Sequence, residues 1–392
     1  MHPSDRALEL AASAIGLTEP NPRVGCAITS ADGRRVLGEG HTQQAGGPHA
    51  EVMALRAAQA AGHDVRGATA WVTLEPCAHH GRTPPCCDAL IRAGIGRVVA
   101  ALEDPFPQVA GQGLARLRAA GVDVQLAGRY DPSFIDNPAC RHPTDPHGEA
   151  WATAARELNI GFLSRVIRKR PWVRMKIAAS LDGTTALADG QSQWITAADA
   201  RTDGHAWRRR ASAVLTGIGT VREDDPRMDV RLVPTPGQPR RVVIDSRLEI
   251  DAAARILQPP GEVLLYCAQA HASSARASTL REAAPNLTVF GAPADAHGKT
   301  DLLAVLEDLA TRGVNELHVE AGYRLNGSLV RAGLVDEWLV YLAPKLLGSG
   351  RGMAEIGPLR DLTQASELEF IDIAPVGRDL RLRARPPGRE RF

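Results

Sequence analysis

Residues 73–86 read TLEPCAHHGRTPPC, and residues 46–51 upstream of them read GGPHAE. These stretches supply one imidazole, His49, and two thiols, Cys77 and Cys86. This three-ligand set is typical of catalytic zinc, which keeps a fourth position for water. The carboxylate of Glu51, two residues after the histidine, is then left to transfer protons rather than to bind metal. The pattern predicts a catalytic metal site in the N-terminal part of the chain.

The sequence around these stretches alternates between strand-like and helix-like patterns. We expect His49 and Glu51 to start a helix, Cys77 to follow a strand, and Cys86 to open the next helix. A helix N-terminus lowers the pKa of a thiol and so favours the thiolate that binds metal. The expected strands are 24–29, 68–74, 97–102 and 122–126, and the expected helices are 50–61, 86–93 and 113–120. This alternation predicts an α/β fold with a mostly parallel sheet.

A break in the pattern separates this region from a second alternating region. Residues 129–150 carry four prolines and little apolar periodicity, which predicts a linker or surface insertion, and residues 158–167 have a helical pattern. Beyond it, the expected strands are 173–179, 213–216, 241–245, 263–267, 317–320 and 338–343, followed by two short strands in the last ~25 residues. The expected helices are 197–210, 302–311 and 324–332. We therefore expect a first domain at 1–128, a linker or insertion at 129–165, and a second domain at 166–392.

Length and composition agree with a two-domain or three-domain enzyme and exclude several other classes. The chain has 392 residues, a net charge of +1 and 4% aromatic residues, which gives no bulk attraction for nucleic acid or an anionic membrane. It has no run of 18 apolar residues to span a membrane, and residues 1–17 have helical spacing rather than that of a signal peptide. Six cysteines are too few for a disulfide framework. We expect a cytoplasmic enzyme.

The ligand set leaves alternatives open. Cys87 competes with Cys86 as the second thiol, and His79 and His80 could also ligate a metal. We favour Cys86, and we interpret the loop between the two thiols as a substrate contact, because its cationic donors suit a phosphorylated substrate. A second cluster, formed by Cys140, His142 and His147, is either another metal site or part of a surface segment.

The second region contains glycines where strands lead into helices. Residues 217–220 read GIGT after one expected strand, and residues 320–322 read EAG at the end of another. Such turns let a phosphate approach backbone N–H groups at a helix N-terminus. They indicate a candidate nucleotide site, although the sequence lacks the GxGxxG fingerprint of a Rossmann fold.

The longer motifs resemble a known family. Residues 49–51 with 76–86 resemble the zinc-deaminase signature H-x-E…P-C-x-x-C, but with eight residues between the two cysteines instead of two. The whole of 73–86 resembles the deaminase half of the bifunctional riboflavin-biosynthesis deaminase–reductases. Further matches to this family are 20–25 (PNPRVG), 46–51, 104–111 (DPFPQVAG), 176–183 (KIAASLDG), 191–196 (QSQWIT), 224–227 (DDPR), 243–246 (VIDS), 319–322 (VEAG) and 343–348 (APKLLG).

The resemblance implies a fold and two reactions. The fold is an N-terminal cytidine-deaminase-like three-layer α/β/α domain followed by a C-terminal dihydrofolate-reductase-like α/β domain. The first reaction is the hydrolytic deamination of 2,5-diamino-6-(5-phosphoribosylamino)pyrimidin-4(3H)-one by zinc-activated water, with Glu51 carrying the protons. The second is the NADPH-dependent reduction of the ribosyl group to ribityl, which gives 5-amino-6-(5-phosphoribitylamino)uracil. Each chain would hold one Zn²⁺ and use NADPH, and it would form a homo-oligomer, either a dimer or a tetramer.

The resemblance also implies the binding residues. The substrate contacts of the first domain would be Asn21, His41, His79 and Arg82, and those of the second would be Lys176, Ser192, Arg208, Arg231 and Glu320. The NADPH contacts would be Ala178, Trp194, Thr220, Asp224, Ser246, Gly322, Tyr323, Arg324, Leu325, Asn326, Gly327 and Ser328. The candidates for polarising the opened sugar are Lys176, Asp224 and Glu320. Ala321 replaces a glycine that is frequent in the family, which affects how closely the backbone approaches the cofactor there.

Two other functions compete with this interpretation. A deaminase of nucleic-acid bases would need a basic face or a platform of stacking aromatic side chains, and the charge and aromatic content argue against both. A non-catalytic zinc scaffold would close the metal site with a fourth protein ligand, and the retained Glu51 argues against that. The expected partner is a small phosphorylated pyrimidine, with no nucleic acid and no membrane.

Overall fold

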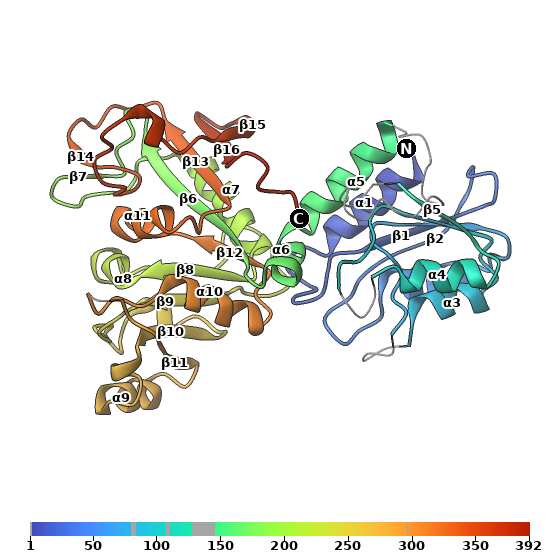
Figure 1. Cartoon of the computed structure of the whole chain (residues 1–392), viewed down its shortest axis with the longest axis horizontal. Helices are drawn as coiled ribbons and strands as arrows, with labels where there is room; N and C mark the ends of the chain where they lie inside the picture. The colour runs from blue at the N-terminus through green and yellow to red at the C-terminus, as the bar shows by residue number, and fades with distance from the viewer. Residues whose placement is uncertain (1, 80–83, 107–109, 128–145, 296) are drawn as a thin grey trace. The chain divides into compact units, whose positions relative to one another are not determined.

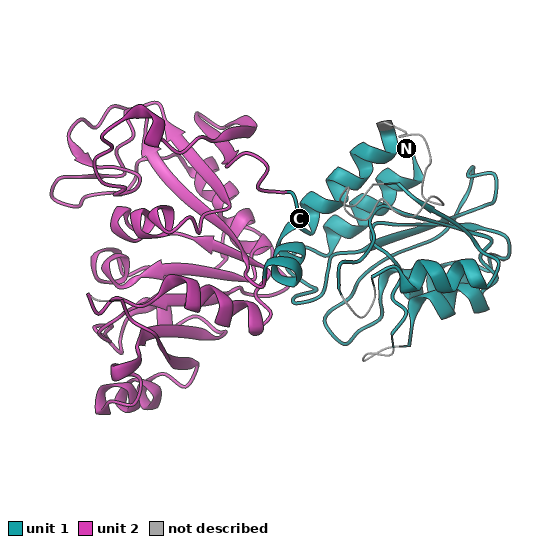
Figure 2. Ribbon diagram, viewed as in Figure 1, with its two compact units in different colours: residues 1–168, 391–392 teal, residues 169–390 magenta. Residues whose placement is uncertain are grey.

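The structure is a computed structural model that describes residues 2–79, 84–106, 110–127, 146–295 and 297–392. The chain divides into two compact units, shown in separate colours in Figure 2. Unit 1 comprises residues 1–168 with 391–392, and unit 2 comprises residues 169–390. Within the described residues, no helix is long and apolar enough to cross a membrane.

Unit 1 is built on a five-stranded sheet with the order β2-β1-β3-β4-β5 (Figure 1). Its strands are β1 (Gly25–Thr29), β2 (Val36–His41), β3 (Thr69–Val72), β4 (Arg97–Ala100) and β5 (Asp123–Leu126). Its helices are α1 (Pro3–Ser13), α2 (Ala50–Ala60), α3 (Cys86–Arg92), α4 (Gln112–Ala119), α5 (Pro146–Leu158) and α6 (Ile160–Arg168). Strand β1 is antiparallel to both of its neighbours, whereas β3, β4 and β5 are parallel.

Glycines show which face of the sheet each helix covers. A Cβ atom on Gly25 of β1 would overlap the backbone of α1, and one on Gly40 of β2 would overlap the backbone of α2. Gly40 pairs with Cys26, the neighbour of Gly25, and successive residues of a strand face opposite sides. The helices α1 and α2 therefore pack on opposite faces of the sheet. This arrangement confirms the predicted three-layer α/β/α domain.

The predicted strands and helices of this region agree with the structure to within a few residues, but the prediction missed two elements. Strand β2 (VLGEGH) was not predicted, because its two glycines and its charges give little apolar alternation. Helix α5 begins at Pro146, inside the segment for which we expected a linker or insertion. Both α5 and α6 belong to unit 1, since Trp151, Ala155 and Phe162 are part of its hydrophobic core.

Unit 2 is built on a nine-stranded sheet with the order β11-β10-β9-β8-β12-β6-β13-β16-β15. The strands from β11 to β13 pair in parallel, and β16 and β15 add an antiparallel edge. Its strands are β6 (Trp172–Ser180), β8 (Ala213–Gly217), β9 (Arg240–Ile244), β10 (Val263–Ala268), β11 (Leu287–Ala292), β12 (Glu316–Val319), β13 (Glu337–Ala343), β15 (Glu369–Val376) and β16 (Asp379–Arg385). A small separate pair is formed by β7 (Ala186–Leu187) and β14 (Gly350–Arg351).

The helices of unit 2 cover both faces of this sheet. They are α7 (Ala198–Arg210), α8 (Ile218–Asp224), α9 (Ala275–Ala283), α10 (Leu302–Thr311) and α11 (Tyr323–Arg331). In β8, Leu215 joins the hydrophobic core that contains α10 and α11, whereas its neighbour Val214 joins the core that contains α9. The sequence predicted six of these strands, the two short strands β15 and β16 near its C-terminal end, and the helices α7, α10 and α11. It missed α8 and α9 as well as β11, which lies in a region without clear periodicity.

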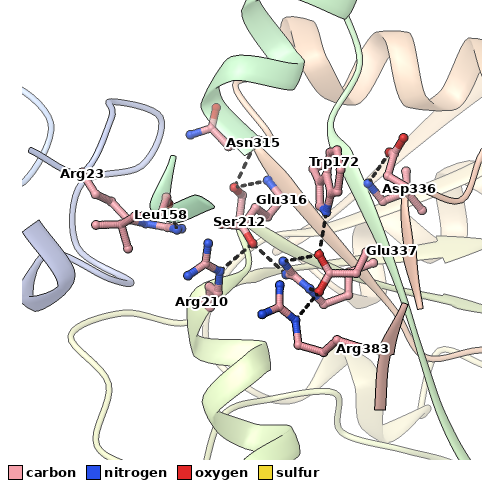
Figure 3. Close-up of polar contacts among 12 residues, drawn as sticks. Arg23, Leu158, Trp172, Arg210, Ser212, Asn315, Glu316, Asp336, Glu337 and Arg383 are labelled. Atoms are coloured by element: carbon pink, nitrogen blue, oxygen red, sulfur yellow. Dashed lines mark hydrogen bonds and ion pairs between the residues drawn. The ribbon is translucent and has the colours of Figure 1, made fainter. Parts of the chain in front are cut away.

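A buried ionic cluster crosses the strands of unit 2 (Figure 3). Arg174 of β6 is fully buried between Glu316 of β12, at 2.7 Å, and Glu337 of β13, at 2.9 Å. Glu337 also forms ion pairs with two arginines of β16, with Arg383 at 2.9 Å and with Arg385 at 2.7 Å. The cluster therefore ties four strands together through charges that are removed from water.

Candidate metal centre and reductase site

The structure brings together the three residues for which the sequence predicts metal binding. His49 is the N-cap of α2, Cys86 is the first residue of α3, and Cys77 lies in the segment between β3 and α3. The Nδ1 atom of His49 lies 3.6 Å from Cys77 Sγ and 3.3 Å from Cys86 Sγ. Tetrahedral zinc with ordinary bond lengths places nitrogen and sulfur ligands about 3.6 Å apart. These residues therefore fit one zinc ion with a fourth position left for water.

The chemistry of the donors also fits a metal ion. Hydrogen bonding from the Cys86 thiol lowers the pKa of Cys77 to about 4, against the opposing effect of burial. The backbone N–H of Cys86, at the start of α3, donates to the same sulfur at 3.4 Å. The pKa shift favours the thiolate form of Cys77, which is the form that binds metal. The hydrogen bond to Cys77, together with burial, raises the pKa of Cys86, which is opposite to the effect expected from its place at the start of a helix.

Glu51 lies in the first turn of α2, next to this donor set. Its side chain is 3% exposed, and burial, followed by the charge of Cys77, raises its pKa to about 7. A carboxyl group with such a pKa can both take up and release a proton near neutral pH.

The alternative ligands fall elsewhere. The Cys87 thiol donates a hydrogen bond to the Asp88 carboxylate at 3.7 Å. It is not part of the cluster of His49, Cys77 and Cys86, which is the one group within the described residues that could hold a metal ion. His80 lies outside the described residues, and so do Cys140 and His142. His147, the remaining member of the second candidate cluster, lies 2.9 Å from the hydroxyl of Ser4.

A cavity of about 430 Å³ opens onto the metal centre. Asn21 and His79, which are predicted substrate contacts, line it together with His49, Glu51 and Cys77. His41, the last residue of β2, is not among the lining residues, although the next residue, Thr42, is. Arg82 lies outside the described residues. The cavity also takes in residues that the sequence analysis did not single out: Glu75, Asp104, Phe106, Phe162 and Arg165.

Two of the residues that the sequence analysis missed, Glu75 and Asp104, are acids that line the same cavity as Cys77. The Glu75 carboxylate accepts hydrogen bonds from the backbone N–H groups of Asp104, Gly111, Gly113 and Leu114 at 2.8–3.1 Å, and so fixes Asp104 and the start of α4. Burial raises the pKa of Asp104 to about 7. Both acids lie within motifs quoted in the sequence analysis, 73–86 and 104–111, and these motifs could have identified them as cavity residues.

In unit 2, Glu320 is the centre of the predicted substrate contacts. It follows β12 and is held by the guanidinium of Arg208 from α7, while the Lys176 ammonium of β6 lies 3.7 Å away. Burial tends to raise the pKa of Glu320, but the charges of Arg208 and Lys176 outweigh it and hold the pKa well below the usual range. Three of the predicted substrate residues therefore form one ion-paired group.

The predicted cofactor turns lie side by side. A Cβ atom on Gly322, the N-cap of α11, would lie 3.7 Å from the Thr220 hydroxyl of α8. The backbone N–H of Asn326 already bonds to the carbonyl of Gly322, and its side chain donates to Met353 O at 3.0 Å. A Cβ on Gly327 would overlap the backbone of Glu355. Backbone N–H groups that could bind a phosphate therefore lie at the start of the predicted 322–328 turn, in residues 323–325.

The remaining predicted residues lie in β6, α8 and α11 and in the segments that follow β7, α8 and β9, with Arg231 in the segment after α8. Ser192 donates to Asp224 at 3.4 Å, and the hydroxyl of Ser246 lies 2.9 Å from that of Thr300. Trp194 is 61% exposed and stacks against the Arg201 guanidinium at 4.5 Å. Ala178 lies in β6, paired with Tyr341 of β13. Tyr323, Arg324, Leu325 and Ser328 lie on α11.

Comparisons with known proteins agree with this two-unit description. The family model described as the cytidine and deoxycytidylate deaminase zinc-binding region matches residues 3–102, and the model described as the RibD C-terminal domain matches residues 171–382. The fold and sites thus define a two-domain enzyme with a zinc-binding deaminase domain and a reductase domain of dihydrofolate-reductase-like fold.

Full-length relatives narrow this class to one family. The riboflavin biosynthesis protein RibD of Escherichia coli K12 is 44% identical over 390 residues, which cover 96% of each chain. The structure of Acinetobacter baumannii RibD (form 1) superposes with a TM-score of 0.82 at 36% identity, covering 98% of each chain. A Thermotoga maritima deaminase/reductase structure gives a TM-score of 0.81 at 30% identity, covering 97% of each chain. The chain belongs to the RibD family and is a bifunctional deaminase and reductase of riboflavin biosynthesis.

Proposed function

We propose that unit 1 deaminates 2,5-diamino-6-(5-phosphoribosylamino)pyrimidin-4(3H)-one and that unit 2 then reduces the ribosyl group of the product to ribityl with NADPH. The observation that carries the proposal is the convergence of His49, Cys77 and Cys86 beside buried Glu51, in a cavity large enough for a nucleotide-sized substrate. The Thermotoga maritima relative is described as a diaminohydroxyphosphoribosylaminopyrimidine deaminase and 5-amino-6-(5-phosphoribosylamino)uracil reductase, which supports the same pair of reactions here.

In the deaminase, His49, Cys77 and Cys86 would hold one zinc ion per chain. When bound, zinc lowers the pKa of a coordinated water molecule and so supplies a nucleophile at neutral pH. Glu51 takes up a proton and passes it to the leaving amine, a role that suits its pKa of about 7. Asn21 and His79 line the cavity and orient the pyrimidine ring.

In the reductase, NADPH supplies the hydride when bound. The start of α11 and the adjacent Thr220 would receive its phosphates, because backbone N–H groups are exposed there. Glu320 stays ionised beside Arg208 and Lys176, so it can accept a hydrogen bond from a sugar hydroxyl but cannot donate a proton. Of the three candidates for polarising the opened sugar, Lys176 and Asp224 therefore remain as proton donors. Burial raises the pKa of Asp224, which favours its protonated form.

Incubation of the purified protein with the diaminopyrimidine phosphate tests this proposal directly. Without NADPH, the mass of the product should correspond to replacement of an amine by oxygen, and ammonia should be released. With NADPH, the mass should rise further by two hydrogens. Recovery of unchanged substrate under both conditions would reject the assignment, and turnover with NADH at the same rate would reject the choice of cofactor.

We also propose that the chain forms a homo-oligomer, a dimer or a tetramer, through the antiparallel edge of the nine-stranded sheet. Strand β15 is the last strand of that sheet, and its side chains Phe370, Ile371 and Ile373 are 41–65% exposed. An exposed apolar edge strand is usually covered in the functional state of a protein. Light scattering should report a mass above that of one chain, and Phe370→Lys should lower it.

A cytoplasmic location is part of the same proposal. Five cysteines in the described part of the chain are free thiols, which suits a reducing compartment. Fractionation of the producing cells should recover the protein with the cytoplasmic enzymes.

A further inference from the structure

A buried histidine lies behind the carboxylate of Glu320. His318 belongs to β12, and its side chain is 0% exposed, whereas that of Glu320 is 14% exposed. The Nε2 atom of His318 lies 3.4 Å from Oε1 of Glu320. Neither the sequence motifs nor the chemistry proposed for the reductase assigns this imidazole a role.

The pleat of β12 determines which side of the sheet His318 faces. Its neighbours Leu317 and Val319 both belong to the hydrophobic core that contains α10 and α11. Because successive residues of a strand face opposite sides, His318 and Glu320 share the other face. Glu320 binds Arg208 of α7 on that face, so the imidazole lies between the sheet and α7.

The strands on either side of His318 give its ring no acceptor. Its partners in the sheet are Arg174 of β6 and Val214 of β8. The guanidinium of Arg174 only donates hydrogen bonds, and the side chain of Val214 is apolar. Neither ring nitrogen of His318 has a hydrogen-bond partner within the described residues, and a buried polar group without one destabilises the fold. The Glu320 carboxylate is therefore the acceptor that this geometry offers to the ring.

The surroundings also favour the uncharged form of the ring. Burial lowers the pKa of His318, Glu320 opposes this effect, and the charges of Arg174 and Arg208 lower the pKa further. The neutral imidazole that predominates at neutral pH carries one N–H group. With this group on Nε2, the ring donates to Glu320 without adding a charge to the site.

The donors around Glu320 divide between its two oxygen atoms. Arg208 donates from Nε to Oε1 and from Nη2 to Oε2, the latter at 3.0 Å. A carboxylate offers about two acceptor sites on each oxygen. With the N–H of His318 on the second site of Oε1, the site left for a ligand lies on Oε2. The Lys176 ammonium is 3.7 Å from this same Oε2 atom.

We propose that His318 is a positioning residue of the reductase: its Nε2–H group donates to Glu320 Oε1 and so directs Oε2, beside Lys176, to a hydroxyl of the sugar. The proposal rests on the reductase function proposed above and extends it to a buried residue that acts only through Glu320. At 3.4 Å the contact is longer than an ordinary hydrogen bond, and contacts of this kind in active sites often shorten when the substrate binds.

The first test compares His318→Leu, His318→Gln and the control Leu317→Val in the full-length protein. Leucine removes the donor but fills the buried space, glutamine keeps an N–H group that can replace Nε2–H, and Leu317→Val alters the opposite face of the same strand. We expect His318→Leu to lower kcat for reduction of the deaminated intermediate about tenfold, the size expected for loss of one hydrogen bond to a charged group. The KM for NADPH should stay unchanged, because Glu320 is a predicted contact of the sugar and not of the cofactor. His318→Gln should recover most of the rate. An unchanged kcat in His318→Leu, or an equal loss in Leu317→Val, would overturn the proposal.

NMR of the histidine ring nitrogens tests the contact without the reductase assay. The chain has 12 histidines, and the signal of His318 is the one missing from both His318 variants. We expect Nε2 to carry the proton in the unaltered protein and its chemical shift to change in Glu320→Gln. A proton on Nδ1 alone would reject the proposal whatever the outcome of the activity assay. If the Nε2 signal behaves as expected while the protein does not reduce the intermediate, the hydrogen bond stands and the proposed reductase function fails.

Discussion

Glu51 is the residue on which the deaminase chemistry depends most directly. In Glu51→Gln the amide keeps the size of the side chain but cannot carry a proton to the leaving amine. We expect ammonia release to fall about 10²–10⁴-fold, the usual contribution of general acid–base catalysis. Measured zinc content should stay at that of the unaltered protein, because Glu51 is not one of the clustered donor atoms. Normal deamination in this variant would rule out the proposed proton transfer.

The two adjacent cysteines provide a matched pair of variants. Cys86 is fully buried with its sulfur 3.3 Å from His49 Nδ1, whereas Cys87 is fully buried with its thiol directed to Asp88. Cys86→Ser should therefore lose zinc, measured by elemental analysis, and deaminase activity with it. Cys87→Ser should keep both. Zinc loss in Cys87→Ser alone would show that Cys87, rather than Cys86, is the ligand.

The clustering of His49, Cys77 and Cys86 could be predicted from sequence because each lies at the start of a helix or just after a strand, where short motifs carry the geometry. The rest of the deaminase cavity could not. Phe162 and Arg165 come from α6, far along the chain, and no local pattern indicates that this helix reaches the cavity. In the same way, His318 reads as an ordinary strand residue until the structure places its ring beside the carboxylate of Glu320.

At the scale of elements, apolar periodicity was sufficient for the buried strands and for the amphipathic helices. Apolar periodicity did not predict the elements that are held by strand pairing or by close backbone packing. Strand β2 is held by pairing with β1 and by close packing of its glycines on α2, neither of which leaves an apolar alternation. Helix α8 begins directly after Gly217 and is short, so the pattern GIGT indicates a turn rather than the start of a helix.

The buried ionic cluster gives a prediction for the stability of the sheet in unit 2. Replacing Arg174 by Met removes the cation between Glu316 and Glu337 and leaves buried carboxylates with fewer partners. Breaking a buried pair from one side costs about 3–5 kcal/mol. Urea unfolding of unit 2, followed by loss of reductase activity, should shift to a lower urea concentration by a corresponding amount. As a control, Arg66→Met removes an exposed ion pair in unit 1 and should leave this midpoint unchanged.

Glu337 makes the same sheet sensitive to acid. Burial tends to raise its pKa, but Arg174, Arg383 and Arg385 outweigh burial and hold the pKa well below the ordinary value of 4.5. Because the pKa is lower in the folded state, the stabilisation is present above pH 4.5 and is lost as the pH falls through the folded-state pKa. The contribution of Glu337 to the unfolding free energy of unit 2 should therefore decrease as the pH falls below about 4.5. This decrease should be smaller in Arg174→Met, and an equal decrease would contradict the assignment to this cluster.

At the scale of the whole molecule, each unit has its own sheet, its own hydrophobic core and its own candidate site. The core around β1, β3 and β4 draws on residues of unit 1, and the two large cores of the nine-stranded sheet draw on residues of unit 2. The three metal-binding candidates all belong to unit 1, and the ion-paired group around Glu320 belongs to unit 2. The two activities should therefore be separable in the intact chain.

Removal of zinc tests this separation. After treatment with a strong chelator and desalting, the protein should lose ammonia release, because His49, Cys77 and Cys86 then hold no metal. NADPH oxidation with the deaminated intermediate should remain at the rate of the untreated protein, since the residues around Glu320 include none of these ligands. Adding back Zn²⁺ should restore deamination, which excludes irreversible damage by the chelator. Loss of both activities, with both restored by Zn²⁺, would mean that the metal also supports the structure of the reductase.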